Sequence, residues 1–305
     1  MNRTDPKALR GAVVVPLATP LLPDGQPDEV GLQSVLDHIV NGGCRGVLVL
    51  GTTGEAASMP PENRRRITEV ACRSLKGRAG AFIGIGDNCR ATSIAYGRHA
   101  LEAGADAVVA HPPSYYQVGA EELEAHYLAL ADQIDGPLFI YNIPSTTHHS
   151  IPLDTVERLS HHPRIVGIKD SEPNLDRLTR LAGMFRDRPD FAVLCGAALH
   201  SARTMEAGAL GFVPSAGNLV PRLCRQLSDA ALDGDFEKAR QLQGQMDEVT
   251  GIYGKEKNLG RILPHLKGAM HLLGFGSGAV LPPLLPLLPT ELETVRARMK
   301  GQGLL

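Results

Sequence analysis

The sequence predicts an α/β fold, a (β/α)8 TIM barrel followed by a C-terminal helical extension. Three observations carry this prediction. From Gly11 to about Arg225, short apolar runs alternate with stretches of helical periodicity, as in βα units with a parallel sheet. There are eight such runs over about 215 residues, which is within the size range of such a barrel. Only 4% of residues are aromatic and none is Trp, so aliphatic side chains must fill the core, as between parallel strands and covering helices.

The expected strands are the apolar runs themselves, because each is followed by Gly, Pro or small polar residues that end it. In chain order they are Gly11–Leu17, Gly46–Leu50, Ala81–Ile85, Ala107–Ala110, Pro137–Tyr141, Ile165–Lys169, Phe191–Cys195 and Gly211–Val213.

The stretches between them predict helices, and several begin with a polar N-cap or an early Pro. Examples are Glu29–Val40, Pro61–Leu75, Thr92–Ala103, Glu121–Gln133 and Leu175–Phe185. Gly43, Gly104 and Gly208 each stand between a helix and the next strand. We expect them to adopt the left-handed conformation that commonly ends a helix.

Beyond Arg225 the strand signals stop, and helical periodicity returns at Asp235–Ile252, Leu259–Leu273 and Thr290–Met299. We therefore expect a catalytic barrel at residues 1–225 and a helical extension at 226–305, whose leucine-rich faces pack on the barrel or on another subunit. A doubly wound sheet is the alternative fold. It would carry a glycine-rich phosphate fingerprint after the first strand, where this chain has Pro16-Leu17-Ala18-Thr19-Pro20.

Charge and cysteine content narrow the function classes. The net charge is −2, which argues against a nucleic-acid or anionic-membrane partner and favours a small-molecule substrate. No apolar run reaches the roughly 18 residues of a membrane span. The five cysteines are scattered and lack a C-x-x-C spacing, so we expect neither disulfides nor a zinc site. A reducing cytoplasm is the expected location.

Chemically active residues are sought at the carboxyl ends of the strands, where TIM barrels build their sites. Lys169 ends the sixth apolar run, so it is expected in or just above the barrel interior. Desolvation there disfavours the ammonium form and provides a neutral amine that can attack a carbonyl. The alternative is a half-exposed lysine paired with Asp170.

Three further strand ends offer polar groups. Tyr141 ends the fifth strand and could exchange a proton with a developing alkoxide, although a core tyrosine is the simpler interpretation. Thr52 and Thr53 lie between glycines and could bind a carboxylate, or form a plain turn. Tyr115 and its neighbour Tyr116 follow the fourth strand, and such aromatics commonly lie at a surface or interface.

No cofactor and no metal is expected. Gly84-Ile85-Gly86 lacks the third glycine of a dinucleotide fingerprint, and Gly51–Glu55 is too short for a P-loop. The pairs His148-His149 and His161-His162 lack the i, i+4 spacing with which two imidazoles on one helix share a metal.

Taken together, Gly51-Thr52-Thr53-Gly54-Glu55, Tyr141-Asn142-Ile143-Pro144 and Ile168-Lys169-Asp170-Ser171 resemble the motifs of the dihydrodipicolinate synthase/N-acetylneuraminate lyase family. The resemblance covers nearly the whole chain. It implies a metal-free, class I aldolase-type enzyme acting on pyruvate or on 2-oxo acids that release it.

The resemblance also implies residue roles. Lys169 would form the Schiff base and Tyr141 would be the general acid/base. Thr52 and Thr53 would hold the pyruvate carboxylate, and Thr53 would also link Tyr141 to Tyr115. That tyrosine, or Tyr116 in its place, would reach in from a neighbouring subunit, and the expected assembly is a homotetramer built of two dimers. We also expect Val213, in the last strand, to line the substrate site.

Two departures from the family pattern bear on the second substrate. The synthases carry an arginine, which holds the carboxylate of aspartate semialdehyde, at the position of Thr146, and a hydroxyl cannot replace its bidentate contact. Sialate lyases have acidic residues where this chain has Gly196-Ala197-Ala198-Leu199. Thr146, His148 and Ser215 are our candidates for the acceptor side.

Three hypotheses follow. The preferred one is a Schiff-base lyase or aldolase that cleaves a 2-oxo acid, such as a 2-oxo-3-deoxy sugar acid, or condenses pyruvate with an aldehyde. The alternative is 4-hydroxy-tetrahydrodipicolinate synthase, with another cation in place of the missing arginine. The third, from another class, is a catalytically silent barrel that binds a 2-oxo acid.

Overall fold

A closed barrel of eight parallel strands forms the centre of the computed structural model, which describes residues 9–255 and 258–305. The strands pair in chain order, and β8 closes the barrel on β1. They are β1 Ala12–Pro16, β2 Gly46–Val49, β3 Gly80–Gly84, β4 Ala107–Ala110, β5 Leu138–Asn142, β6 Ile165–Asp170, β7 Ala192–Cys195 and β8 Gly211–Phe212. The predicted TIM barrel is confirmed, and each strand lies within two residues of its expected bounds.

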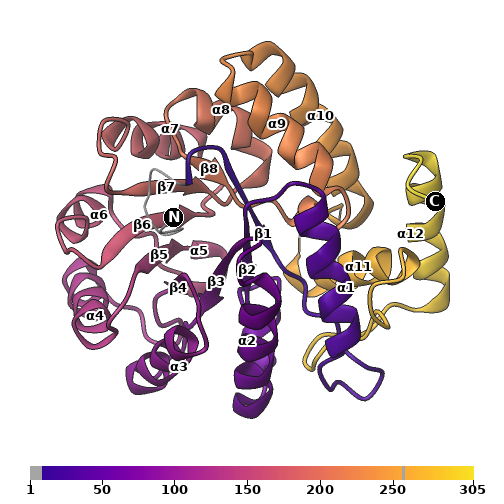
Figure 1. Ribbon diagram of the computed structural model, residues 1–305, viewed down its shortest axis with the longest axis horizontal. Coiled ribbons are helices and arrows are strands. Elements are labelled where there is room, and N and C mark those ends of the chain that lie inside the picture. The colour runs from indigo at the N-terminus through magenta and orange to yellow at the C-terminus, as the bar shows by residue number, and fades with distance from the viewer. Residues whose placement is uncertain (1–8, 256–257) are drawn as a thin grey trace.

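Helices form a ring around the strands (Figure 1). They are α1 Glu29–Asn41, α2 Pro61–Leu75, α3 Arg90–Glu102, α4 Ala120–Gln133, α5 Pro144–Thr147, α6 Leu153–Leu159, α7 Leu175–Met184, α8 Ser201–Glu206 and α9 Pro221–Leu232, with one-turn 3-10 helices η2 Ala56–Ser58, η3 Ala198–His200 and η4 Ser215–Asn218. Gly43, Gly104 and Gly208 have φ values of 87°, 95° and 115°, so the predicted left-handed helix ends are confirmed.

The C-terminal extension consists of α10 Phe236–Tyr253, α11 Leu259–Leu272 and α12 Pro289–Gly301. Figure 1 shows its last two helices in yellow at the right-hand edge of the molecule. Phe275, which follows α11, packs against His38 of α1, with ring centroids 4.9 Å apart. The Ser277 hydroxyl donates to the Leu21 carbonyl, which joins the extension to the segment after β1. Helix α9 runs across the predicted boundary at residue 225, so the division into two units stays a prediction.

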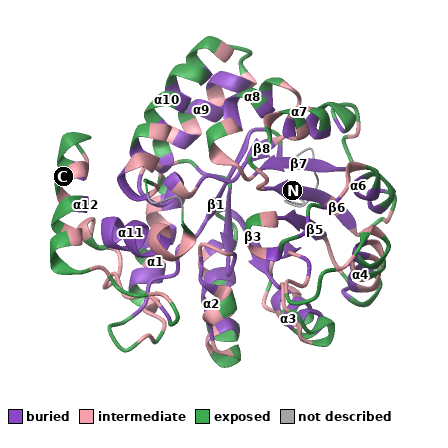
Figure 2. Ribbon diagram, turned by 180° about the vertical axis from the view of Figure 1, so that it is seen from behind, coloured by how far each residue is buried: buried purple, intermediate pink, exposed green. Residues whose placement is uncertain are grey.

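Burial follows the barrel geometry (Figure 2). The strands are buried except for the half-buried Val166 in β6, and most helices bury one face and expose the other, whereas α11 is buried from Leu263 to Met270. Inside the barrel the Phe82 and Phe139 rings meet edge to face, with centroids 5.6 Å apart. A second and larger apolar cluster lies between the strands and the helices. Among the described residues, no helix is long and apolar enough to cross a membrane.

Candidate active site

Lys169 and Tyr141 lie side by side because they are paired in the register of β6 and β5. Side chains alternate along a strand, so register partners point to the same face of the sheet. Here that face is the barrel interior. The Lys169 ammonium nitrogen, Nζ, lies 3.9 Å from the centroid of the Tyr141 ring, a distance at which the positive charge is attracted by the ring face.

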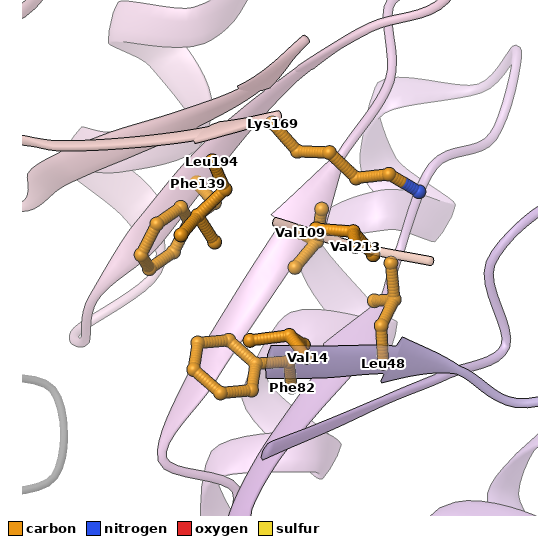
Figure 3. A pocket seen from close by; sticks show the side chains of 8 residues that line it. All are labelled: Val14, Leu48, Phe82, Val109, Phe139, Lys169, Leu194 and Val213. Atoms are coloured by element: carbon orange, nitrogen blue, oxygen red, sulfur yellow. The ribbon is translucent and has the colours of Figure 1, made fainter. Parts of the chain in front are cut away.

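Lys169 lies at the mouth of the barrel interior. It lines a cavity of about 10 Å³, close to the smallest space that holds one water molecule. Figure 3 shows its nitrogen directed away from the Phe82 and Phe139 rings. The cavity is otherwise lined by apolar side chains, namely Val14, Leu48, Phe82, Val109, Phe139, Leu194 and Val213. Val213 lines this cavity with Lys169, and its expected part in substrate binding stays a prediction.

The sequence left open a half-exposed Lys169 paired with Asp170. Instead, Lys169 is only 5% exposed. Asp170, the next residue on the strand, faces the other side and forms an ion pair with Arg177 at 2.9 Å. The alternation of the strand separates the two neighbours, so Lys169 has its charge inside the barrel and Asp170 outside it.

Tyr141 is buried, and its hydroxyl lies 3.4 Å from the Thr52 hydroxyl. Burial by itself raises the pKa of the phenol. The positive charge of Lys169, with hydrogen bonds from Thr52, Lys169 and Ser171, outweighs burial and holds the Tyr141 pKa below its usual value. A phenol with a lowered pKa gives up its proton more readily than a free tyrosine.

The loop after β2 presents Thr52 to Tyr141. Its backbone is tightly constrained. Leu50 has a φ of 57°, in the left-handed region. A Cβ added to Gly84 would lie only 2.0 Å from the Leu50 carbonyl oxygen. Any larger residue at Gly84 would push this loop away. The threonine hydroxyl that contacts Tyr141 is that of Thr52. Thr53, the next residue in the loop, is half-buried.

A cleft of about 410 Å³ opens beside Thr52. It is lined by the loop after β2, by residues that follow β4 and β5, and by the C-terminal extension. The lining residues are Leu50, Gly51, Thr52, Glu55, Ala56, Ala57, Ser58, His111, Ser114, Thr146, Thr147, Leu263, Pro283 and Leu284. The cleft is lined by Thr52, whose hydroxyl contacts Tyr141, and its size suits a small-molecule ligand.

A network of polar groups fixes the β5 and β6 ends from outside the barrel. Asp170 accepts hydrogen bonds from the Asn142 amide at 2.9 Å and from the Glu172 backbone N–H at 3.0 Å. Arg177 donates to Asp170 and also to the Ile151 carbonyl, at 2.7 Å. Burial raises the pKa of Asp170, and Arg177 and Asn142 oppose that shift. The segments that carry Tyr141 and Lys169 are therefore held together.

The structure places the three acceptor-side candidates differently. Thr146 lines the cleft with Thr52. His148 is exposed at the end of α5, where its φ is 61°, and it is not among the cleft residues. The Ser215 hydroxyl lies 2.9 Å from the hydroxyl of Tyr253 in the extension.

Tyr115 and Tyr116 project from the loop after β4. They are 79% and 72% exposed, and their rings meet edge to face at 5.1 Å. The backbone of this loop is held from two sides: the Asn88 side chain accepts from the Tyr115 N–H, and the buried His149 contacts the Tyr116 carbonyl. Two large exposed aromatic rings on a fixed loop are typical of a protein interface.

Sequence reasoning missed His111 and gave no role to Glu55 or Lys267. His111 follows β4 directly and lines the cleft, so the strand-end rule could have found it. Burial lowers the pKa of His111. Its Nδ1 lies 2.8 Å from the Pro112 carbonyl, so Nδ1 carries the proton and the neutral ring keeps a lone pair on Nε2.

Comparison with known proteins gives matches over almost the full length. The sequence profile of the Dihydrodipicolinate synthetase family matches residues 9–302. A relative from Gluconacetobacter diazotrophicus, named 4-hydroxy-tetrahydrodipicolinate synthase, is 34% identical over 292 residues, which cover 96% of this chain and 97% of the relative.

Two solved structures that contain pyruvate are also similar. Dihydrodipicolinate synthase from Acinetobacter baumannii, described as chloride-inhibited, is 28% identical with a TM-score of 0.90, over 96% of this chain and 99% of that one. YagE, a prophage protein of the same family from E. coli K12, is 27% identical with a TM-score of 0.88, again over 96% and 99%.

These matches confirm the resemblance drawn from the strand-end motifs. Members of the family are carbon–carbon lyases of the class I aldolase type that work through a Schiff base. The chain therefore belongs to the dihydrodipicolinate synthetase family and is a Schiff-base-forming enzyme of this type.

Proposed function

We propose that Lys169 is the lysine that forms the Schiff base, with pyruvate as the substrate it holds. The observation that carries this proposal is the position of Lys169 Nζ, which lies at the mouth of the barrel against the Tyr141 ring. The lysine amine, in its neutral form, adds to the ketone carbon of pyruvate; one proton is taken up from solvent, and the ketone oxygen leaves as water. The resulting protonated imine withdraws electrons from the neighbouring methyl carbon.

In this proposal Tyr141 moves the protons. In condensation, the Tyr141 phenolate takes a proton from the methyl carbon of the imine, and the resulting enamine attacks the aldehyde carbon. The aldehyde oxygen becomes an alkoxide, which takes a proton from the phenol; cleavage is the reverse. Water then hydrolyses the imine and frees Lys169. The lowered pKa of Tyr141 suits both directions.

Thr52 and Thr53 are proposed to bind the pyruvate carboxylate. Their loop follows β2, and the 3.4 Å contact between the Thr52 and Tyr141 hydroxyls supports this role. Val213 forms part of the wall beside Lys169. The substrate would thus have its charged end at the loop and its methyl group toward the cleft.

For the second substrate, the comparisons favour the alternative of the sequence analysis over the sugar-acid lyase that we preferred there. The relative described above is named 4-hydroxy-tetrahydrodipicolinate synthase. The leading candidate reaction is therefore the condensation of pyruvate with aspartate semialdehyde.

One observation favours a second candidate, in which the aldehyde carries no carboxylate. The cleft contains Thr146 where the synthases have their arginine, and no lysine or arginine is among the described residues that line it. Neutral polar groups, including Thr146 and the free Nε2 of His111, suit a hydroxylated aldehyde better than a carboxylate. The cleavage of 2-oxo-3-deoxy sugar acids fits this chemistry.

Activity measurements on two variants test the catalytic proposal. Lys169→Ala should lower turnover by about 10⁴-fold or more, as loss of a covalent nucleophile does in other enzymes. Tyr141→Phe should lower it by about 10²- to 10⁴-fold. A Lys169→Ala variant with near-normal turnover would exclude the proposed Schiff base.

A substrate comparison separates the two candidate reactions. The wild-type enzyme is assayed for condensation of pyruvate with aspartate semialdehyde and with glyceraldehyde, and for pyruvate release from 2-oxo-3-deoxy sugar acids. Turnover on the order of 10 per second with aspartate semialdehyde, typical of many enzymes, would support the leading candidate. A clear preference for glyceraldehyde or for sugar-acid cleavage would support the second.

We also propose a homotetramer of two dimers in the cytoplasm. The exposed pair Tyr115 and Tyr116 supports an interface at the loop after β4. In this assembly Tyr115 would extend into the neighbouring site, toward Thr53 and Tyr141. Analytical ultracentrifugation of the wild type and of Tyr115→Ala tests it, with a shift toward smaller species expected for the variant.

A further inference from the structure

A buried ion pair joins the loop after β2 to the C-terminal extension. Glu55 is the last residue of the Gly51-Thr52-Thr53-Gly54-Glu55 motif, and its carboxylate accepts a hydrogen bond from Lys267 Nζ at 2.5 Å. The two side chains are 1% and 3% exposed. The other carboxylate oxygen accepts from the Leu281 backbone N–H at 2.6 Å. Both oxygens of Glu55 are therefore bound by the extension.

The backbone at Glu55 is strained as well. Its φ is 55°, in the left-handed region that non-glycine residues rarely adopt. Such strain persists only where surrounding contacts hold it, and it concentrates at functional sites. The preceding turn is anchored by the Thr19 hydroxyl, which donates to the Gly54 carbonyl at 3.1 Å. The motif is thus held from the barrel at Gly54 and from the extension at Glu55.

Stability alone does not explain why a charged pair occupies this place. Removing two charges from water costs nearly as much as their attraction returns, and well-packed apolar residues are often equally stable. An ion pair with a second hydrogen bond does define direction and distance more sharply than apolar packing. The arrangement therefore points to a need for accurate placement of the motif.

The group being placed is Thr52, three residues before Glu55, whose hydroxyl contacts Tyr141. The same cleft is lined by Glu55 and Thr52 from the motif and by Leu263, Pro283 and Leu284 from the extension. A change in the distance between motif and extension would thus alter both the Thr52–Tyr141 contact and the width of the cleft.

We propose that Glu55 and Lys267 are positioning residues, through which the C-terminal extension sets the place of the substrate-binding loop in the active site. This inference rests on the proposed function, because it takes Thr52 to bind the pyruvate carboxylate. It gives the extension a part in catalysis, although neither Glu55 nor Lys267 touches the reacting atoms.

The decisive variant removes both charges together. In the Glu55→Gln/Lys267→Met protein, the amide oxygen can still accept from the Leu281 N–H, and Met fills the space of the lysine stem, so no unpaired charge is buried. We expect thermal stability close to that of the wild type. We expect the KM for pyruvate to rise, and kcat to fall, with a combined loss of about 10- to 100-fold in kcat/KM.

The single variants Glu55→Gln and Lys267→Met provide the contrast. Each leaves one buried charge without its partner, so each should be less stable than the double variant. If the pair were only structural, activity would recover with stability in the double variant. If it positions the loop, activity stays low while stability recovers.

A matched control makes the same exchange at an exposed pair. Arg66 and Glu29 form an ion pair between α2 and α1, and their side chains are 49% and 41% exposed. Glu29→Gln/Arg66→Met should leave KM and kcat unchanged.

Borohydride trapping with pyruvate separates failure of this inference from failure of the proposed function. A wild-type adduct with an unchanged half-saturating pyruvate concentration in the Glu55→Gln/Lys267→Met protein would overturn the inference and leave the proposed function standing. No adduct in the wild type would overturn the proposed function itself. An adduct in both proteins, with half-saturation raised about tenfold or more in the double variant, is the expected result.

Discussion

Two buried ion pairs lie next to the proposed active site, and they are built differently. Asp170 and Arg177 are seven residues apart and share a network with Asn142 and the Ile151 carbonyl. Glu55 and Lys267 are 212 residues apart and connect the loop after β2 with the extension. The first pair holds two neighbouring strand ends together, whereas the second joins two distant parts of the chain.

The two pairs also differ in how many hydrogen bonds the carboxylate keeps when its cation is lost. In the network Asp170 keeps the Asn142 and Glu172 hydrogen bonds even if Arg177 is lost. Glu55 has Lys267 and one backbone N–H. We therefore expect the Asp170 network to keep the ends of β5 and β6 in place when one of its members is substituted. The long-range pair, by contrast, should respond to any shift of the extension.

The largest expected effect comes from leaving one carboxylate unpaired in each region. Lys267→Met should lower the free energy of unfolding by about 3–5 kcal/mol, the usual consequence of breaking a buried pair, and Arg177→Met should lower it by less, because Asp170 keeps two hydrogen bonds. Urea denaturation measures the loss. Hydrogen exchange then locates it, around residues 142–172 for Arg177→Met and at α11 for Lys267→Met. Faster exchange in the same segments in both variants would contradict the comparison.

A smaller loss of stability is expected when a side chain is added next to the end of β6, the strand that carries Asp170. A Cβ on Gly196 would lie 2.2 Å from the Ser171 hydroxyl and 3.1 Å from the Lys169 Cε. Gly196→Ala should therefore lower stability by about 1–3 kcal/mol, as overpacking does, and also reduce Schiff-base formation. Gly183→Ala in α7 is the matched control, because nothing lies within 4 Å of its added Cβ. Equal melting temperatures for the two variants would show that Gly196 is not crowded.

The mildest expected effect is a shift in pH dependence at Tyr141. Its folded-state pKa is lowered, because the Lys169 charge and three hydrogen bonds outweigh burial. Its contribution to the free energy of unfolding is thus fully present above the unfolded pKa near 10 and is lost as pH falls through the folded value. Subtracting the ultraviolet tyrosinate signal of Tyr141→Phe from that of the wild type isolates the Tyr141 signal. This difference should titrate with a midpoint below pH 10. A difference signal that titrates only above pH 10 would be inconsistent with the site geometry.

Much of the fold could be predicted because its signals are local. The alternation of apolar runs and helices is present in every βα unit, and α2 and β4 have the expected bounds. The short helices α5, α6 and α8 were not predicted, since segments of four to seven residues show too little of a 3.6-residue period. Helix α9 was missed as well, because the change from barrel to extension was placed within it.

The candidate site was predictable where chemistry coincides with a strand end. Lys169 and Tyr141 meet because their strands are adjacent and in register, which a barrel of eight parallel strands implies. The position of His148 could not be predicted, since it depends on a left-handed turn after α5. The Glu55–Lys267 pair could not be predicted either, because no local pattern relates residues 212 positions apart.

Mapping the trapped adduct tests the central claim most directly. Among the residues that the structure describes, the buried lysines are Lys169 and Lys267, and only the first is proposed to react. After treatment with pyruvate and borohydride, peptide mass spectrometry should find the reduced pyruvate adduct on Lys169 and none on Lys267. An adduct on Lys267 or on any other lysine in place of Lys169, or no adduct at saturating pyruvate, would contradict the account.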